Sequence, residues 1–155
     1  MLRTAVLAVP AAVAAALVAT TAGPFAATGR HGPPAPLQLR SQVQDAHVVD
    51  AAPAGPSAGD ALVFTERLLD ARGRVVGSDA ASCVRLFDQR SLCTGTYVLP
   101  GGQLMVQLLQ PGPTGVYTQA VTGGTGRYAR ARGTVVVDQR ADGDRFTFRV
   151  RPGGR

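Results

Sequence analysis

Eight short runs of strand-forming residues follow one another from residue 42 onward, and turns rich in Gly and Pro separate them. The runs are Gln42–Asp50, Asp60–Leu69, Arg74–Leu86, Ser91–Leu99, Gln103–Leu109, Val116–Val121, Arg127–Gln139 and Arg145–Arg151. Strands at such short spacing, with little helical signal, are typical of an all-β sandwich or barrel. We predict an all-β fold, an eight-stranded antiparallel up-and-down β-barrel, because closing the sheet removes its exposed edges. The interior of such a barrel holds side chains or one small ligand.

A glycine-rich stretch, Ala120–Gly133, predicts a strand end, a tight turn and a second strand. We expect Gly123, Gly124 and Gly126 to supply positive φ angles, which residues with a Cβ adopt only at a cost. The valines that follow have branched side chains, which suit a pleated and half-buried surface. Gly133 lies inside the second strand and predicts a bulge or bend that lets the sheet curl.

Alternation within the runs assigns side chains to the two faces of the sheet. In the last run, the apolar residues of Phe146–Val150 are expected to point inward, while the arginines between them face solvent. In the fifth run, the inward set is either every second residue of Leu104–Leu108 or the pair Met105 and Leu109. In the second run, every second residue of Leu62–Leu68 shares one face, which places Glu66 on a mostly apolar wall.

The beginning of the chain has the layout of a secretory signal peptide, because Arg3 precedes the apolar run Thr4–Thr21 and small residues follow. We predict a signal peptide over residues 1–27, a flexible spacer over 28–41 and the barrel domain over 42–155. The alternative is a retained membrane anchor, which Pro10 and the length of the run disfavour. The protein is therefore expected to be secreted and extracellular, without stable membrane insertion after processing.

The formal net charge is +6, and all 16 basic residues are arginine. A basic balance can indicate an anionic partner such as nucleic acid or anionic lipid. We do not expect nucleic-acid binding, because only 5% of the residues are aromatic and the arginines are not gathered into a groove-reading element. The arginines of the last run alternate with apolar residues, as on the solvated face of a strand.

Cys83 and Cys93 are the only cysteines. In an exported chain, two cysteines that each lie in a strand-like run indicate a disulfide. Metal ligation and a redox pair are the alternatives, but the surroundings offer too few His and Asp residues for a metal, and the spacing is not C-x-x-C. The bond would clip a hairpin that turns at Phe87–Arg90 and contribute about 2–3 kcal/mol.

Five segments carry a family resemblance in this order along the chain: Val43–Asp50, Gly59–Thr65, Val76–Cys83, Met105–Gln107 and Ala120–Gly133. Together they resemble the allene oxide cyclase barrel family, whose barrel is shared by plant dirigent proteins and small secreted actinobacterial proteins. The resemblance implies an eight-stranded antiparallel barrel, often trimeric, around a largely hydrophobic cavity. It also implies a small hydrophobic molecule as the partner and a homo-oligomer as the assembled form.

The resemblance further implies roles for single residues. Asp50 falls on the acidic residue of the plant cyclases, Glu66 on a water-holding Asn, and Cys83 on their cavity cysteine. Ala52 replaces a second Asn of that site, so the plant cyclase reaction itself is not expected. The segment that contains Arg132 is similar to the stretch after the glycines in dirigent proteins, which hold two phenoxy radicals so that their coupling gives one stereoisomer.

The residues themselves favour an acid–base site. Asp50 and Glu66 are candidate catalytic residues if both face the cavity, because an apolar wall and a second carboxylate raise a carboxyl pKa. Alternatively, Asp50 caps the turn at Pro53–Ser57, and Glu66 pairs with an arginine at the barrel mouth. Candidate ligand-binding residues are Phe64, Tyr97, Tyr117, Tyr128 and Arg132. The tyrosines are alternatively packing residues with a satisfied hydroxyl.

The sequence shows no nucleophile–base order and no metal-ligand spacing, so neither a metal nor a cofactor is expected. Three functions stay open: a barrel that binds a small hydrophobic molecule and directs its stereochemistry, a cofactor-independent cyclase or isomerase that uses Asp50 and Glu66, and a non-catalytic envelope interaction module with a solid interior. A cavity on the order of a few hundred Å³ would separate the first two functions from the third.

Overall fold

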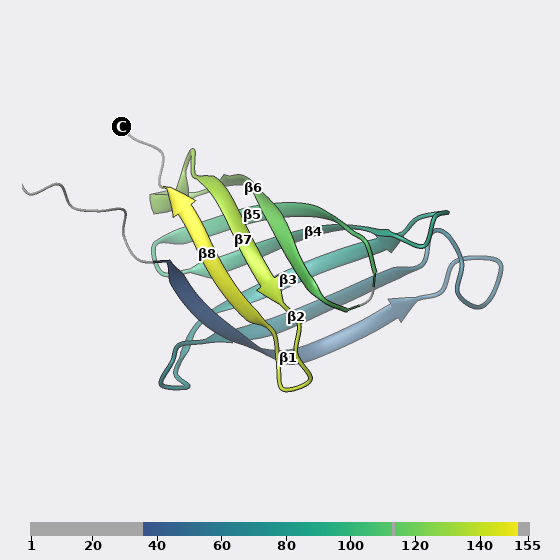
Figure 1. The fold of residues 1–155 in the computed structure, drawn as a ribbon, viewed down its shortest axis with the longest axis horizontal. Coiled ribbons are helices and arrows are strands. Elements are labelled where there is room, and N and C mark those ends of the chain that lie inside the picture. Colours follow the sequence, from purple (N-terminus) through teal and green to yellow (C-terminus); the bar gives the residue numbers. More distant parts are fainter. Residues whose placement is uncertain (1–35, 113, 152–155) are drawn as a thin grey trace, which may run out of the picture. The chain divides into compact units, whose positions relative to one another are not determined.

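The computed structural model describes residues 36–112 and 114–151, which form one closed β-barrel with a short 3-10 turn. The elements are β1 Leu37–Val49, β2 Ala61–Leu69, β3 Val75–Arg85, β4 Ser91–Leu99, β5 Gly102–Gln110, β6 Val116–Gly124, η1 Gly126–Tyr128, β7 Arg132–Asp138 and β8 Arg145–Arg151. Each strand pairs antiparallel with the next, and β8 pairs with β1 to close the sheet (Figure 1). The predicted fold class is confirmed.

The predicted signal peptide, residues 1–27, lies outside the described residues, as do residues 28–35 of the predicted spacer. Within the ranges that the structure describes, no helix is long and apolar enough to cross a membrane.

Two predicted strand boundaries need correction. β1 begins at Leu37 rather than at Gln42, so residues 37–41 of the predicted spacer belong to the barrel. These residues close it, because Leu37–Arg40 pair with β8 and Leu39 is buried in the core. The predicted strand Arg127–Gln139 is shorter, because η1 precedes β7.

The glycine-rich segment also differs in part from its prediction. Gly123 and Gly124 lie within β6, and of the three turn glycines only Gly126 has a positive φ, 57°. A Cβ on Gly126 would lie 2.1 Å from the carbonyl oxygen of Gly101, so the close backbone contact also requires glycine there. At Gly133 the β7–β8 register runs on without a shift, so this pair has no bulge there, although the φ of Gly133 is 140°, which residues with a Cβ rarely adopt. The register shifts lie in the β1–β2, β2–β3 and β5–β6 pairs instead.

The core fills one half of the barrel interior. Phe146 and Phe148 point inward as predicted and are 3% and 5% exposed. On β5 the inward set begins with the fully buried Leu104, whereas Met105 faces outward. The ring of Tyr97 is fully buried and packs edge-on against both phenylalanines, with ring centroids 5.4 and 5.0 Å away. Such ring pairs contribute about 0.5–1.5 kcal/mol each beyond the burial of their area. Packed side chains therefore fill this part of the barrel interior.

Candidate functional site

The other half of the interior is a cavity of about 510 Å³, which begins where the packed core ends. On β2, Leu68 belongs to the core, whereas Glu66 and Phe64 line the cavity. On β4, Tyr97 belongs to the core and Gly95 lines the cavity. We call the inward residues at this boundary the floor; they are Glu66, Asp79, Asp144 and Phe146. A cavity of this volume is in the range of small-molecule sites.

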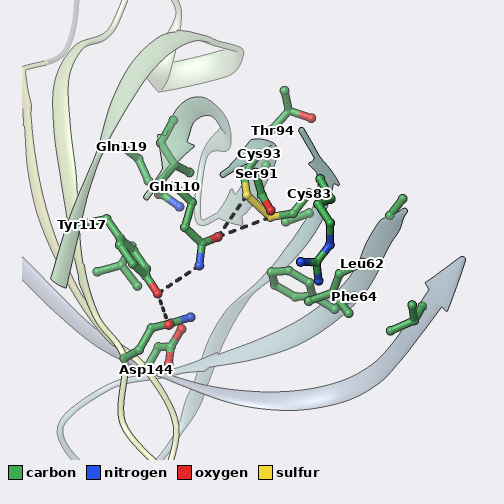
Figure 2. Close-up of a pocket in the computed structure, with 18 of the residues that line it drawn as sticks. Leu62, Phe64, Cys83, Ser91, Cys93, Thr94, Gln110, Tyr117, Gln119 and Asp144 are labelled. Atoms are coloured by element: carbon green, nitrogen blue, oxygen red, sulfur yellow. Dashed lines mark hydrogen bonds between the residues drawn. A yellow bond between two sulfur atoms is a disulfide. The ribbon is translucent and has the colours of Figure 1, made fainter. Parts of the chain in front are cut away.

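The walls above the floor are largely apolar. They are built by Leu62, Phe64, Ala81, Leu108, Val137 and the disulfide between Cys83 and Cys93. Figure 2 shows Leu62 and Phe64 on one side of the cavity and Tyr117 and Gln110 across from them. The disulfide that the sequence predicts is present, and it joins β3 to β4 at directly paired positions.

Two carboxyl groups face each other at the floor. Glu66 on β2 and Asp79 on β3 are direct cross-strand partners, and the Cβ atoms of such partners lie about 4.5–5.5 Å apart. Each residue is only 5% exposed. Neither forms an ion pair with any residue that the structure describes. Asp79 Oδ1 is the one buried side-chain oxygen or nitrogen in the described ranges that lacks a hydrogen-bond partner.

Burial changes the acidity of the floor. It raises the pKa of Glu66 to about 7, and the negative charge of Asp144 adds to this effect while a hydrogen bond with Ser41 opposes it. Burial likewise raises the pKa of Asp79 to about 7, and the charge of Glu66 raises it further. Burial also raises the pKa of Asp144. The floor therefore holds carboxyls that can gain or lose a proton near neutral pH.

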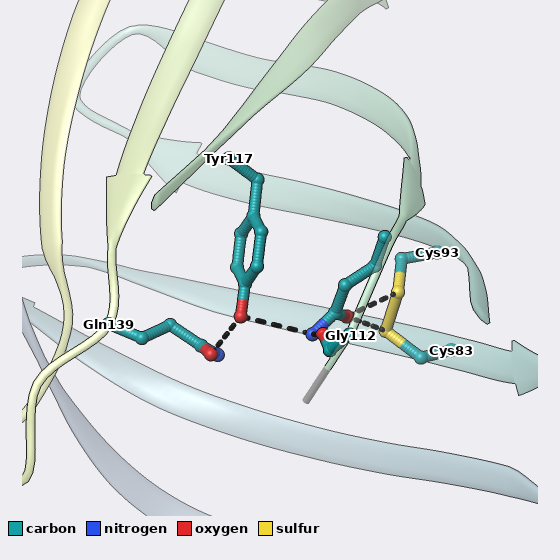
Figure 3. The surroundings of a disulfide bond; sticks show 6 residues. Cys83, Cys93, Gly112, Tyr117 and Gln139 are labelled. Carbon is teal, nitrogen blue, oxygen red and sulfur yellow. Dashed lines mark hydrogen bonds between the residues drawn. A yellow bond between two sulfur atoms is a disulfide. The ribbon is translucent and has the colours of Figure 1, made fainter. Parts of the chain in front are cut away.

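A polar row crosses one wall of the cavity (Figure 3). The hydroxyl of Tyr117 donates a short hydrogen bond to Gln139 Oε1, and Gln110 Nε2 donates to the same hydroxyl over 3.1 Å. Gln110 Nε2 also donates to the carbonyl of Gly112 over 2.7 Å. Gln110 Oε1 lies 3.3 Å from the sulfur of Cys93, which is a polar contact rather than a hydrogen bond because disulfide sulfurs carry no hydrogen. The row holds Gln110 and Tyr117 in fixed orientations at the cavity surface.

The end of the cavity away from the floor, which we call the mouth, is lined by the β1–β2 loop and by Arg85 at the end of β3. Asp60 organises this mouth. Its carboxylate accepts hydrogen bonds from the backbone N–H groups of Ser57 over 2.7 Å and of Ala51 over 3.0 Å, which lowers its pKa. Arg85 also lines the mouth, with its Nε 3.8 Å from Asp60. Asp60 therefore ties the β1–β2 loop to the end of β3 and engages the arginine at the entrance.

The structure brings four of the seven predicted catalytic and ligand-binding residues to the cavity: Asp50, Phe64, Glu66 and Tyr117. Tyr97 lies in the core, where its hydroxyl donates to Gln119 Oε1 over 2.7 Å. Tyr128 packs against the core from η1, and Arg132 is exposed at the start of β7. These last three residues do not line the cavity, and contact of any of the seven with a ligand stays a prediction.

The two predicted catalytic carboxyls are not neighbours. Asp50 is exposed at the mouth, where it accepts a hydrogen bond from the backbone N–H of Gly55 over 3.2 Å. Glu66 lies on the floor, five residues into β2 from the mouth, and at about 3.4 Å per residue this is about 17 Å of strand. Asp50 thus has the loop contact that the alternative interpretation expects, while Glu66 has Asp79 rather than an arginine beside it.

Sequence reasoning missed Asp79, Asp144 and Gln110. Asp79 had a usable signal, because it alternates with Ala81 and Cys83 and so shares the face of the predicted cavity cysteine. Asp144 had a weaker signal, because it lies two residues before the inward Phe146 but just outside β8. Among the described residues, no group of three or more His, Cys, Asp and Glu side chains is arranged to hold a metal ion.

Comparison with known proteins agrees with this architecture. The family model of the allene oxide cyclase barrel like domain matches residues 40–150. Pyocyanin demethylase is similar in structure, with a TM-score of 0.69 and 25% identity over 75% of this chain and 99% of that chain. None of the curated proteins compared with the chain matches it.

Two further solved structures share the fold at lower identity. The Diels-Alderase AbmU from Streptomyces koyangensis has a TM-score of 0.59 and 17% identity over 76% of this chain and 67% of that chain. A pterocarpan synthase dirigent protein has a TM-score of 0.54 and 17% identity over 72% and 84%. With a closed eight-stranded barrel and a family match over residues 40–150, the chain belongs to the allene oxide cyclase barrel-like family.

Proposed function

We propose that this barrel binds one small, largely apolar organic molecule in its cavity and holds it in a defined orientation. The observation that carries the proposal is the open half of the interior, about 510 Å³ in volume with apolar walls. The third function that the sequence left open was an interaction module with a solid interior. The cavity argues against it, because such a module would have its interior filled by side chains. The ligand binding of family members supports the proposal, since the similar structures include a demethylase and a Diels-Alderase.

The arrangement of the walls can orient a ligand. The apolar body of the molecule would pack on Leu62 and Phe64, and its polar atoms would meet Gln110 and Tyr117 across the cavity. Gln110 and Tyr117 are fixed by their own hydrogen bonds, so their positions do not adapt to the ligand. A molecule held between a rigid apolar wall and fixed polar groups presents one face to a reaction partner, which is how a binding barrel directs stereochemistry.

A pair of adjacent substitutions on β3 tests the proposal. Ala81 lines the cavity, whereas the neighbouring Ala80 is exposed on the outer face. Naphthylmethanol is a suitable neutral probe, because the chain has no Trp and naphthalene fluorescence can be followed without indole emission. We expect Ala81→Phe to abolish saturable binding by filling the cavity and Ala80→Phe to leave it unchanged. Equal binding by both variants, or no binding by the unsubstituted protein, would contradict the proposal.

A second candidate function is proton transfer on the bound molecule, as in a cofactor-independent isomerase or cyclase. The observation that favours it is the pair Glu66 and Asp79, whose pKa values of about 7 suit general acid–base catalysis. In this version Asp79 takes the place of Asp50 as the partner of Glu66. The test is to incubate the molecule that co-purifies with the protein in D₂O and to follow deuterium uptake by mass spectrometry. Catalysis predicts that uptake needs Glu66, whereas unchanged uptake with Glu66→Gln would argue against it.

Two further properties belong to the proposal. We propose that the chain is secreted, and its disulfide is consistent with an oxidising compartment. N-terminal sequencing of protein from the culture medium should then give a start near residue 28. We also propose that it forms a homo-oligomer, a trimer by family resemblance, which light scattering of the processed protein would measure.

A further inference from the structure

We propose that the carboxyl pair Glu66–Asp79 at the floor binds a protonated amine carried by the molecule in the cavity. This inference rests on the proposed function, because it names the chemical class of ligand for the same site. It assigns a role to Asp79 and makes the ligand an amphipathic cation, with its apolar body against the walls and its ammonium group at the floor.

The first support is an unsatisfied acceptor. Asp79 lines the cavity and is only 5% exposed. Its Oδ1 has no hydrogen-bond partner among the described residues. Most buried polar side-chain atoms have a partner, and one that lacks it carries its full desolvation cost. Oδ1 itself has almost no accessible surface, so a ligand N–H reaches it once the Asp79 carboxylate turns toward the cavity. Such a hydrogen bond would remove this cost, and the site therefore calls for a hydrogen-bond donor.

The second support is the charge around the floor. The ionisable groups near the pair are Asp144, which precedes β8, and Tyr97 from β4, and the neutral group is Ser41 from β1. Gln119 from β6 accepts the hydrogen bond of the Tyr97 hydroxyl. The guanidinium groups near Asp144 have closer partners, since Arg145 pairs with Asp142 and Arg140 with Asp138. The charge of Arg145 and a hydrogen bond from the Arg140 backbone lower the pKa of Asp144, but burial raises it more. The one arginine that lines the cavity, Arg85, is at the mouth beside Asp60. Among the residues that the structure describes, the floor therefore has three carboxyls and no lining cation.

A protonated amine meets both requirements at once. Its N–H donates to Asp79 Oδ1, and its positive charge offsets the negative charge of the carboxylates in a poorly solvated site, where a charge-assisted hydrogen bond is strong. A neutral alcohol supplies a donor without the charge. An anionic ligand would meet like charges and is excluded from this end of the cavity.

Protons are coupled to the binding. Burial raises the pKa of both carboxyls to about 7, so near neutral pH the pair holds a proton that an arriving ammonium group displaces into the buffer. The affinity for an amine should therefore rise between about pH 6 and about pH 8, whereas the affinity for a neutral analogue should stay constant.

Three probes of the same shape test the inference: naphthylmethylamine, naphthylmethanol and methylnaphthalene. Their dissociation constants are measured by naphthalene fluorescence at about pH 6 and about pH 8, and calorimetry in two buffers of different ionisation enthalpy counts the protons released. The variants are Asp79→Asn and Glu66→Gln. Asp45→Asn is the matched control, because it removes a carboxylate from an exposed side chain of β1 that is outside the cavity.

At about pH 8 we expect the amine to bind about tenfold or more tightly than the alcohol, the range of a charge-assisted hydrogen bond. The preference should shrink at the lower pH and disappear in Asp79→Asn and Glu66→Gln, and the control should keep it. Retained binding of the alcohol shows that the variants are folded.

Equal binding of amine and alcohol to the unsubstituted protein would overturn the inference and leave the proposed function intact. A preference that survives in both floor variants would overturn it as well, because the amine would then be recognised elsewhere. If none of the three probes binds, the proposed function fails, and the inference fails with it.

Discussion

Raising the pH from about 5 to about 8 should weaken the folded barrel, because folding buries two carboxyls that ionise in this range. The pKa of Glu66 rises from 4.5 to about 7 and that of Asp79 from 3.8 to about 7 when the chain folds. Between these limits the folded state binds more protons than the unfolded state. The free energy of unfolding therefore falls as the pH rises and levels off above about pH 7.

The magnitude follows from the width of this window. About two pH units separate pH 5 from the folded pKa, and each unit is worth about 1.4 kcal/mol per group, so each carboxyl alone would cost about 3 kcal/mol. The two costs do not add fully, since part of the shift of Asp79 arises from the charge of Glu66. The effective dielectric constant of a protein interior, about 20, also weakens the interaction between the charges. We expect a total loss of about 2–4 kcal/mol, a large fraction of the stability of a typical domain.

Urea unfolding at the two pH values measures this loss. In Asp79→Asn the slope should fall to about half, because Glu66 still titrates. In the double variant with Glu66→Gln only the contribution of Asp144, whose pKa burial also raises, should remain. At about pH 8, Asp79→Asn should be more stable than the unsubstituted protein by about 1–3 kcal/mol. The exposed control Asp45→Asn should keep the original slope. Carboxyls with lowered pKa values, such as Asp60, destabilise the protein only when they gain protons in more acidic solution, so they do not mask the effect.

The reasoning would be refuted by a free energy of unfolding that is constant or that increases from about pH 5 to about pH 8. It would also be refuted if the double variant kept the slope of the unsubstituted protein. Either result would mean that the floor carboxyls are ionised at little cost and that water or the backbone solvates them.

Two predictions concern the scaffold. Cys83→Ser breaks the bond to Cys93, which closes a loop with a sequence separation of 10, and should lower the free energy of unfolding by about 2–3 kcal/mol without reductant. The matched measurement is the free energy of unfolding of the unsubstituted protein after reduction, which should fall by the same amount. Unchanged stability in both cases would contradict the loop-closure account. Gly126→Val should cost about 2 kcal/mol or more in the same assay, because φ is positive and the new Cβ would lie 2.1 Å from the oxygen of Gly101. Gly112→Ala, where a Cβ meets nothing within 4 Å, is the control, and equal losses would refute the steric argument.

Local residue patterns determined the strands and their faces. Alternation placed Phe146 and Phe148 in the interior, and the turn residues separated eight strands, because the side-chain period of a strand is a local property. The two cysteines, each within a strand-like run, predicted the disulfide. The same local patterns misplaced the start of β1, since a strand that begins beside a Pro-rich segment is recognised only by its partner β8.

The depth of each side chain along the barrel was decided by the tertiary structure. Alternation shows that Glu66, Tyr97 and Asp79 face inward, but it does not show that Tyr97 fills the solid half while the carboxyls lie at the boundary. That depends on the register between strands and on the stagger that closes the barrel. The strand pairing places Asp79, an acidic residue of the next strand, opposite Glu66. Asp50 lies at the mouth of the cavity instead. The chemical character of the cavity floor thus comes from residues that are neighbours only because the strands pair.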